Sequence, residues 1–316
     1  MAAATTTAPP PDVSAEVLQA LRAKADWRGA LFRSVLLFSL LLSLLILVVL
    51  LVQVVTDGWP VLSGRLSDFV TSPLRSSADE AGIVQSLQGT FWLAIITAVV
   101  AFPLGIAAAI YLEEYATQGR WSAFIDLNIR NLAGVPSVVY GILGLTIFVR
   151  GIGPLTGGTT PIAAGLTLAA LVLPVVIITS AEAIRSVPQP LREAGYGVGA
   201  TKWEVVKDHV LPYAAPGILT GTLLSLARAA GEAAPLILVG AITGRLGASY
   251  DLWDLSQLRE RFTAMPITIT TWSRLPQQEF KVDNAAAAIV ILIAFVLLLN
   301  SVAILLRNRF EKKRGS

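Results

Sequence analysis

Long apolar runs, separated by short polar segments, dominate the pattern of hydrophobic and polar positions along this chain of 316 residues. Each run has the roughly 17–25 residues that an α-helix needs to cross the hydrocarbon core of a bilayer. The six runs are Ser34–Val55, Thr90–Leu112, Leu132–Val149, Pro161–Ala181, Tyr213–Ile242 and Ala285–Leu306. The pattern therefore predicts an all-α, polytopic membrane protein with about six transmembrane helices.

Proline lies inside two of these runs, as Pro103 in the second and Pro174 in the fourth. A proline inside a helix removes one backbone hydrogen bond and frees a carbonyl group. In a membrane this is tolerated where neighbouring helices satisfy the freed carbonyl. The two prolines favour a packed bundle with mobile parts over a simple anchor.

The composition supports a membrane protein and excludes several kinds of site. Hydrophobic residues make up 54% of the chain and charged residues only 14%, whereas soluble domains carry about a quarter of their residues as charges. The chain has no cysteine and a single histidine, His209. Disulfides, thiolate catalysis, zinc–cysteine sites and histidine-based metal clusters are thereby excluded, and we expect no cofactor.

The positive charges set the expected orientation, because loops rich in Lys and Arg face the cytoplasm. Placing both termini in the cytoplasm puts most Lys and Arg residues on that side, including the basic C-terminal tail, residues 307–316. Residues 1–33 are predicted to form a disordered cytoplasmic tail, and residues 34–306 the transmembrane domain. The first apolar run is too long for a signal peptide.

Two long polar segments, residues 56–89 and 243–284, are then expected outside the cell. The second contains Trp253, Trp272 and charges of both signs. One interpretation is a solvated loop with aromatic residues at the membrane interface. The other is a lid or docking surface for an extracytoplasmic partner.

Arg228 and Glu232 lie four residues apart inside the fifth apolar run. A lone arginine at the bilayer centre costs about 2.5–3.5 kcal/mol on insertion scales, so a reason for it is expected. At this spacing the two side chains share a helix face and can pair. The pair is therefore either a packing ion pair, supported by the small residues Gly217 and Gly221, or part of an oxyanion pathway. Guanidinium suits the second role because it gives two fixed donors and stays protonated.

The cytoplasmic segment 188–212 is predicted to form two short helices around a glycine turn. Its glycines, at positions 195, 197 and 199, are expected to break the first helix. Thr201 and Glu204 have capping-box spacing, which predicts a second helix over Lys202–Leu211. We expect Trp203, Val206 and Val210 on one face of this second helix, and Pro212 to end it. The result is a rigid knob, a surface for a partner protein.

Other charged residues lie where the apolar runs meet the cytoplasm. Glu113 and Glu114 follow the second run, and Glu182 and Arg185 end the fourth. We expect all four to be solvated or interfacial helix ends.

Within the knob, Glu193-Ala194-Gly195, followed by Gly199 and then Leu211-Pro212, resembles the EAA loop of ABC importer permeases. In that family the loop forms a coupling helix that sits in a groove of the cytoplasmic ATPase. The resemblance implies this role for Glu193, Ala194 and Gly199. The chain departs from the family pattern in Gly195, where alanine is usual, and in His209, where isoleucine is usual.

Three further segments, residues 128–145, 199–241 and 284–310, are similar to phosphate-specific ABC importer permeases of the PstA type. The sharpest match is Ala227–Pro235, and the resemblance extends from about residue 85 onward, so the core is residues 85–306. It implies a type I-like permease fold in the cytoplasmic membrane, with Arg228 and Glu232 on the path of inorganic phosphate. The implied partners are ATPase subunits, a PstC-type sister permease and an extracytoplasmic phosphate-binding protein.

The chain is not expected to be an enzyme itself. The glycines near Lys202 lack the spacing of a phosphate-binding loop, so ATP hydrolysis is expected on separate subunits. Two alternatives remain: a permease of the same architecture for another oxyanion such as molybdate or sulfate, and an ion-coupled secondary transporter or intramembrane enzyme. The absence of a GxSxG or HExxH motif, and of inverted repeats with paired broken helices, argues against the second.

Overall fold

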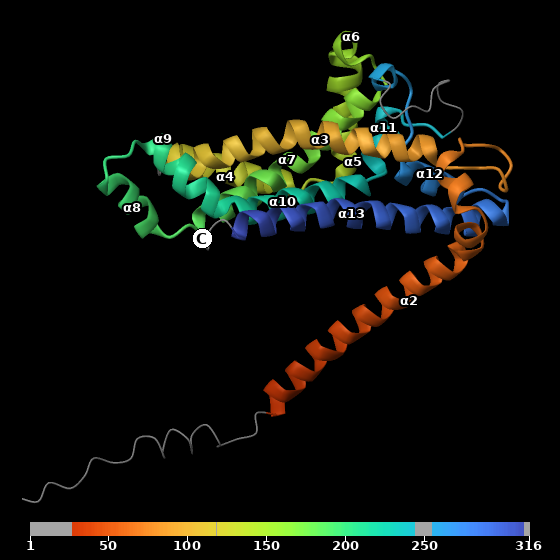
Figure 1. The fold of residues 1–316 in the computed structure, drawn as a ribbon, viewed down its shortest axis with the longest axis horizontal. Coiled ribbons are helices and arrows are strands. Elements are labelled where there is room, and N and C mark those ends of the chain that lie inside the picture. The colour runs from red at the N-terminus through yellow and green to blue at the C-terminus, as the bar shows by residue number, and fades with distance from the viewer. Residues whose placement is uncertain (1–26, 118, 244–254, 313–316) are drawn as a thin grey trace, which may run out of the picture. The chain divides into compact units, whose positions relative to one another are not determined.

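The computed structural model describes residues 27–117, 119–243 and 255–312. Its regular structure is entirely helical within these ranges, which confirms the predicted all-α class (Figure 1). The longer helices are α2 Trp27–Thr71, α3 Val84–Ile110, α4 Arg120–Ala133, α5 Ser137–Gly144, α7 Pro161–Arg185, α8 Gln189–Gly197, α10 Leu211–Ala230, α12 Met265–Trp272 and α13 Ala285–Lys312. Shorter helical segments are η1 Tyr111–Tyr115, η2 Leu145–Gly151, α6 Gly153–Thr156, α9 Lys202–Glu204, η3 Val205–Val210, α11 Ala234–Val239, η4 Leu255–Arg259 and η5 Glu279–Asn284.

Five helical stretches among the described residues are long and apolar enough to cross a membrane. A sixth is reached if α4 and the helix after it, bent by 99° at a short break, count as one span. The predicted number of about six spans is therefore met when the bent pair counts as one span.

The chain divides into two compact units, residues 1–53 and 54–316. The described part of the first unit is the start of α2, which begins at Trp27, inside the predicted tail of residues 1–33. At the other end of the chain, α13 continues to Lys312, into the predicted tail of residues 307–316. Helical structure thus extends beyond the apolar runs into both predicted tails.

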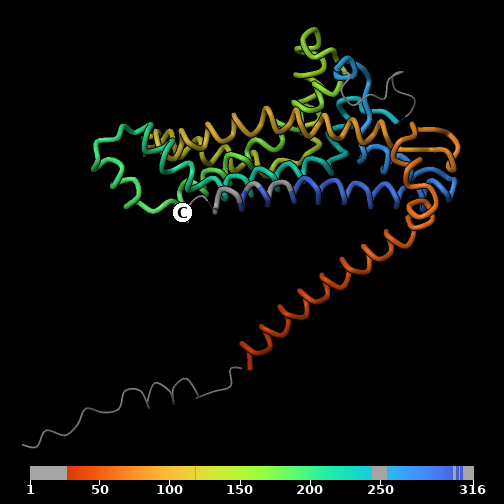
Figure 2. The backbone as a smooth tube through the Cα atoms, in the orientation of Figure 1, coloured from red at the N-terminus to blue at the C-terminus, as the bar shows by residue number. Residues whose placement is uncertain are grey.

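The core of the second unit is a bundle in which α3, α7, α10 and α13 run side by side (Figure 2). Small residues allow α10 to approach α7 closely, as the sequence predicts. A methyl group on Gly217 would lie 2.8 Å from Cβ of Ala183, and one on Gly221 would lie 2.4 Å from Oγ1 of Thr179. Pro103 and Pro174 lie inside α3 and α7, as predicted.

The predicted third span, Leu132–Val149, is wrong as a continuous helix, because the chain breaks between α4 and α5. Pro136 cannot donate to the carbonyl of Leu132, and it disfavours helical backbone at the preceding residue. The hydroxyl of Tyr140 donates to the Leu132 carbonyl at 2.9 Å, alongside the backbone N–H of Val135 at 3.1 Å. The break is thus stabilised by a side chain from the following helix.

The predicted fifth span, Tyr213–Ile242, is also broken. Helix α10 ends at Ala230 and α11 begins at Ala234, because Pro235 cannot bond the carbonyl four residues earlier. A methyl group on Gly141 of α5 would lie 2.8 Å from Cα of Pro235, so α5 and α11 are in close contact. Paired broken helices are therefore present, contrary to the sequence-based expectation, and α5 and α11 pack against one another.

The segments predicted as long polar loops are partly helical and contain buried aromatic residues. Trp272, expected at an interface or in a loop, is buried between Phe69 and Phe280, with ring centroids 6.1 and 5.5 Å away. Trp253 lies outside the described residues. At this end of the bundle the packing is that of a protein core.

Arg65 ties together three parts of this end. The backbone of α2 is non-helical there, with φ of −148°, and the guanidinium lies over the ring of Phe69. It donates to the carbonyls of Ala78 and Ala81, and to Oδ1 of Asn284 at 2.7 Å. This one side chain joins the end of α2, the loop after it and the end of η5, which leads into α13.

Candidate functional site

The Arg228–Glu232 pair lies where α10 stops. Arg228 is in the last turn of α10 and Glu232 is in the linker to α11. Their Nε and Oε1 atoms are 3.6 Å apart, so the expected pairing is present. The Arg228 side chain is 60% exposed and that of Glu232 only 19%. Glu232 therefore belongs to the packed part of the chain, whereas the guanidinium of Arg228 is open to its surroundings.

A small pocket beside Arg228 lies between the break that separates α4 from α5 and the last turns of α10. Its lining includes Ala133, Val135 and Ser137 from the break between α4 and α5, together with Ser225 and Arg228 from α10. Two broken helices thus meet at one arginine. The sequence predicted the arginine but not the breaks that surround it.

The exposure of Arg228 bears on the two interpretations of the pair. A packing ion pair that locks α10 against neighbouring helices of this chain would have both side chains buried. Glu232 approaches Nε of Arg228 at 3.6 Å, and the largely exposed Arg228 side chain also lines the pocket. An oxyanion can therefore reach the guanidinium, which binds such anions with two parallel hydrogen bonds.

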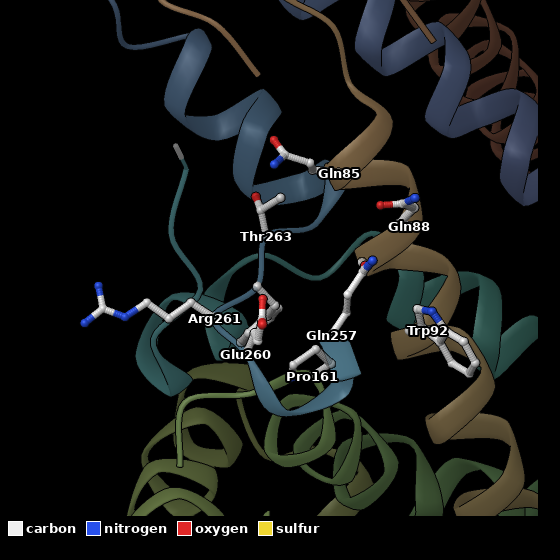
Figure 3. Close-up of a pocket in the computed structure, with 10 residues that line it drawn as sticks. Gln85, Gln88, Trp92, Pro161, Gln257, Glu260, Arg261 and Thr263 are labelled. Atoms are coloured by element: carbon white, nitrogen blue, oxygen red, sulfur yellow. The ribbon is translucent and has the colours of Figure 1, made fainter. Parts of the chain in front are cut away.

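A second pocket, drawn in Figure 3, lies at the start of α3, the opposite end of that helix from the knob. Amide side chains of Gln85, Gln88 and Gln257 line it, together with Glu260 and Arg261. The guanidinium of Arg261 points away from the glutamines in Figure 3. A carboxylate in the lining, with the cation turned outward, suits an anion less well than the Arg228 pocket does.

The first helix of the 188–212 knob ends in a Schellman motif, a hydrogen-bonded glycine turn. Gly199 has a φ of +86°. Its N–H donates to the carbonyl of Tyr196, and the N–H of Ala200 donates to the carbonyl of Gly195. Gly199 is therefore the residue that stops α8. The prediction that Gly195 and Gly197 also break the helix is wrong, because α8 runs through both.

The second helix of the knob begins with the predicted capping box. Thr201 accepts from the backbone N–H of Glu204, and the Glu204 carboxylate accepts from the N–H of Thr201. The predicted end at Pro212 is wrong, since the helix continues into α10 with Pro212 in its first turn. A proline is tolerated in a first turn, where the missing donor is not needed.

The predicted apolar face of this second helix is partly wrong. Val206 and Val210 are buried, but Trp203 is exposed and Val205 takes its place. Residues 205–210 form a π-helical turn, whose period is longer than the 3.6 residues on which the prediction relied.

The three residues assigned to ATPase coupling are all on the surface of the knob. Glu193 and Ala194 are exposed on α8, and Gly199 is exposed at the turn. Gly195 is buried, and a methyl group there would lie 2.8 Å from Cγ2 of Val205 and 3.3 Å from Cδ2 of His209. The two positions that depart from the EAA pattern, 195 and 209, are therefore neighbours.

Glu114 is a functional candidate that the sequence did not reveal. Its side chain is 6% exposed and pairs with Arg192 of α8 at 2.8 Å, so the prediction of a solvated helix end is wrong for this residue. Glu113, 17% exposed, pairs with Arg185. No local signal marks these pairs, because the partners lie more than 70 residues away in the sequence.

No group of three or more His, Asp or Glu residues that could hold a metal ion occurs in the described ranges.

Comparisons with known proteins agree with this architecture. A profile of the family described as "Binding-protein-dependent transport system inner membrane component" matches residues 101–316. The phosphate transport system permease protein PstA of Yersinia pestis is 34% identical over 304 residues, which cover 95% of this chain and 97% of that protein. PstA 1 of Mycobacterium tuberculosis (strain CDC 1551 / Oshkosh) is 34% identical over 248 residues, or 77% of each chain.

Among solved structures, a chain of a bacterial alginate ABC transporter, in complex with an alginate pentasaccharide-bound periplasmic protein, has a similar fold. The TM-score is 0.60 over 87% of this chain and 93% of that one, at 17% sequence identity. At this identity the similarity concerns the fold alone, and it confirms the predicted importer-permease architecture.

Proposed function

We propose that this chain, which belongs to the family of binding-protein-dependent inner membrane transport components, carries inorganic phosphate into the cell. Family membership makes it a multi-pass permease subunit of an ABC importer and not itself the ATPase. The substrate is the proposed part. It rests on the position of Arg228 and on the similarity to proteins named phosphate transport permeases.

The observation that carries the proposal is the open guanidinium of Arg228 at the junction of two broken helices. Phosphate is a small oxyanion, and a guanidinium offers it two parallel donors. Transporter substrate sites are typically built where membrane helices are interrupted. The exposed side of Arg228 would face the sister permease, so that the pathway runs between the two subunits.

Glu232 has a different role in this scheme. It holds Arg228 at 3.6 Å when no anion is bound and keeps the empty site near neutral. Its negative charge also limits how tightly an anion rests there. Weak binding is needed in a conduit, since an ion held too firmly is not released.

Glu193, Ala194 and Gly199 form the proposed contact with the ATPase. The first two present an exposed face on α8, and Gly199 shapes the turn beside it. A short helix of this kind, tied at both ends to the bundle, can transmit a movement of the ATPase to the membrane helices. Both termini lie on the same, cytoplasmic side in this scheme.

Two further partners belong to the proposal. One is a PstC-type sister permease, which completes the pathway opposite Arg228. The other is an extracytoplasmic phosphate-binding protein, which docks on the parts of residues 56–89 and 243–284 that face outward.

The test is phosphate uptake by the reconstituted complex with Arg228→Gln. We expect the complex to assemble and uptake to fall by about 10- to 100-fold, the loss associated with hydrogen bonds to a charged group. The matched control is Arg130→Gln, because Arg130 also forms an exposed i, i+4 pair, with Asp126 at 2.9 Å. Unchanged uptake in Arg228→Gln would contradict the proposed pathway. Uptake of molybdate or sulfate in preference to phosphate would contradict the proposed substrate.

A further inference from the structure

Three consecutive residues at the end of α3 each contact a cation from a different helix. They form the last part of η1, the π-helical turn that continues α3 toward the knob. The contacts are Glu113 with Arg185 of α7, Glu114 with Arg192 of α8, and Tyr115 with Lys202 of α9. We call Glu113–Tyr115 the η1 seat.

Arg192 makes the most extensive of these contacts. Its Nε and Nη2 donate to Oε1 of Glu114 at 3.1 and 2.8 Å. Its Nη1 donates to the carbonyl of Val187 at 2.6 Å, and Nη2 also donates to the carbonyl of Ile184 at 2.9 Å. The last carbonyls of a helix lack partners inside the helix, so Arg192 also caps the end of α7.

The other two contacts are more exposed. The Arg185 side chain is 57% exposed where it meets Glu113. Nζ of Lys202 lies 5.0 Å from the ring centroid of Tyr115, within the range of a cation–π contact. Lys202 is also the first residue of α9, so both short helices of the knob are attached to the η1 seat.

The π-helical turn explains how three neighbouring residues reach three different helices. A π turn is wider than an α turn and is typical of functional positions. The turn closes with a hydrogen bond from the N–H of Ala116 to the carbonyl of Tyr111 at 2.8 Å. Since η1 continues α3, and α3 packs along α7, the knob is fixed directly to the two central helices of the bundle.

We propose that the η1 seat, through Glu114 and Arg192, sets the angle of the knob and passes its movement to α3 and α7. Both are positioning residues, and the proposal rests on the knob's assigned role as the ATPase contact. In addition to the covalent link from η3 into α10, the structure provides this second route, which reaches the centre of the bundle without passing through Arg228.

The experiment compares Arg192→Gln with Arg185→Gln in the complete reconstituted complex. Arg185→Gln is the matched control, because it removes the neighbouring pair on the same turn, in which the arginine is 57% exposed. Phosphate uptake and ATP hydrolysis are measured on the same preparation. We expect Arg192→Gln to lower the phosphate transported per ATP hydrolysed by about tenfold, within the range of allosteric coupling. Arg185→Gln should keep this ratio within about twofold of wild type, as expected for an exposed ion pair.

A second variant guards against loss of folding. Glu114→Gln keeps the size of the side chain and an oxygen acceptor, and leaves Arg192 to cap α7. It should lower the same ratio, though less than Arg192→Gln does. A ratio that stays at the wild-type value in both variants overturns the proposal, as does an equal effect of Arg185→Gln. If both variants fail to assemble, the η1 seat is needed only for folding, and this result also overturns the proposal.

A readout that does not depend on the cargo separates this proposal from the proposed function. The chain contains no cysteine, so spin labels can be attached at Gln189→Cys on α8 and Ala123→Cys on α4, both exposed positions. Arg192→Gln should broaden the distribution of distances between the labels, and Arg185→Gln should not. If the wild type hydrolyses ATP but takes up no phosphate, the proposed substrate is wrong while this comparison still decides the role of the η1 seat.

Discussion

Two arginine–glutamate pairs in this chain have the same chemistry and opposite surroundings. Arg228 and Glu232 meet at 3.6 Å at the end of α10, with the Arg228 side chain 60% exposed. Arg192 and Glu114 meet at 2.8 Å, with the Arg192 side chain only 14% exposed and two backbone carbonyls among the acceptors of its guanidinium. The first arginine has donors to spare, and the second has most of its donors occupied.

The difference indicates what each pair can do. A guanidinium with unoccupied donors can exchange one partner for another, as the passage of an anion requires. A guanidinium surrounded by acceptors holds its neighbours in one arrangement. The two pairs also lie in different parts of the bundle. The open pair, Arg228–Glu232, lies at the helix breaks, and the saturated pair, Arg192–Glu114, lies at the base of the knob.

The largest expected effect is the difference between the two pairs in the free energy of unfolding that is lost when the arginine is replaced by methionine. Arg192→Met leaves the Glu114 carboxylate buried without its partner, and should lower the free energy of unfolding by about 3–5 kcal/mol. Arg228→Met removes an exposed partner and should cost no more than about 1 kcal/mol. Thermal unfolding of the purified complex measures both. Combining Arg192→Met with Glu114→Met should recover most of the loss, because no unpaired charge remains. Equal losses for the two single variants would contradict the comparison.

A smaller effect on stability tests whether the knob, which the Arg192–Glu114 pair holds at its base, also depends on the conformation of its glycine turn. Gly199 has a φ of +86°, and Gly197 is helical; a methyl group on either would meet nothing within 4 Å. Gly199→Ala should therefore cost about 1–2 kcal/mol through backbone strain alone. Gly197→Ala should stabilise the knob by roughly 0.5–1 kcal/mol. The free energy of unfolding of the two variants provides the measurement. A loss of stability in Gly197→Ala would contradict the assignment of the backbone strain to Gly199 alone.

The smallest effect concerns packing inside the knob. Gly195→Ala gains about 1 kcal/mol of helix propensity but places a methyl group 2.8 Å from Cγ2 of Val205. Overpacking of this kind costs roughly 1–3 kcal/mol, so we expect a net loss of about 1 kcal/mol. The double variant with Val205→Ala should be less destabilised than the two single losses added together. If the losses in free energy of unfolding are additive, the side chains at positions 195 and 205 are not in steric conflict.

The features predicted correctly from the sequence are those with local causes. The apolar runs predicted the helices, the spacing of Thr201 and Glu204 predicted a capping box that is present, and the glycines of α10 predicted its close approach to α7. Each of these depends on residues within a few positions of one another, or on composition alone.

The features that the sequence did not reveal depend on distant partners or on interrupted periodicity. The breaks near Pro136 and Pro235 lie in segments that stay apolar throughout, so hydropathy does not mark them. Pro103 and Pro174 lie in similar segments and leave their helices unbroken. Glu114 looked like a solvated helix end because its partner, Arg192, is 78 residues away. For the candidate site, the sequence supplied Arg228 and Glu232 but not the meeting of two broken helices around them.

Arg65 has a consequence for the biogenesis of the protein. Its guanidinium bonds Asn284, a partner 219 residues later in the chain. At about 5–20 residues per second of synthesis, this acceptor emerges roughly 10–45 s after the arginine. Until then the end of α2 lacks the contact that joins it to the end of η5, the segment that leads into α13. A late part of the chain therefore completes the packing around the end of α2, and a truncated product ending before residue 284 would leave this end of the bundle incomplete and accessible to quality-control proteases.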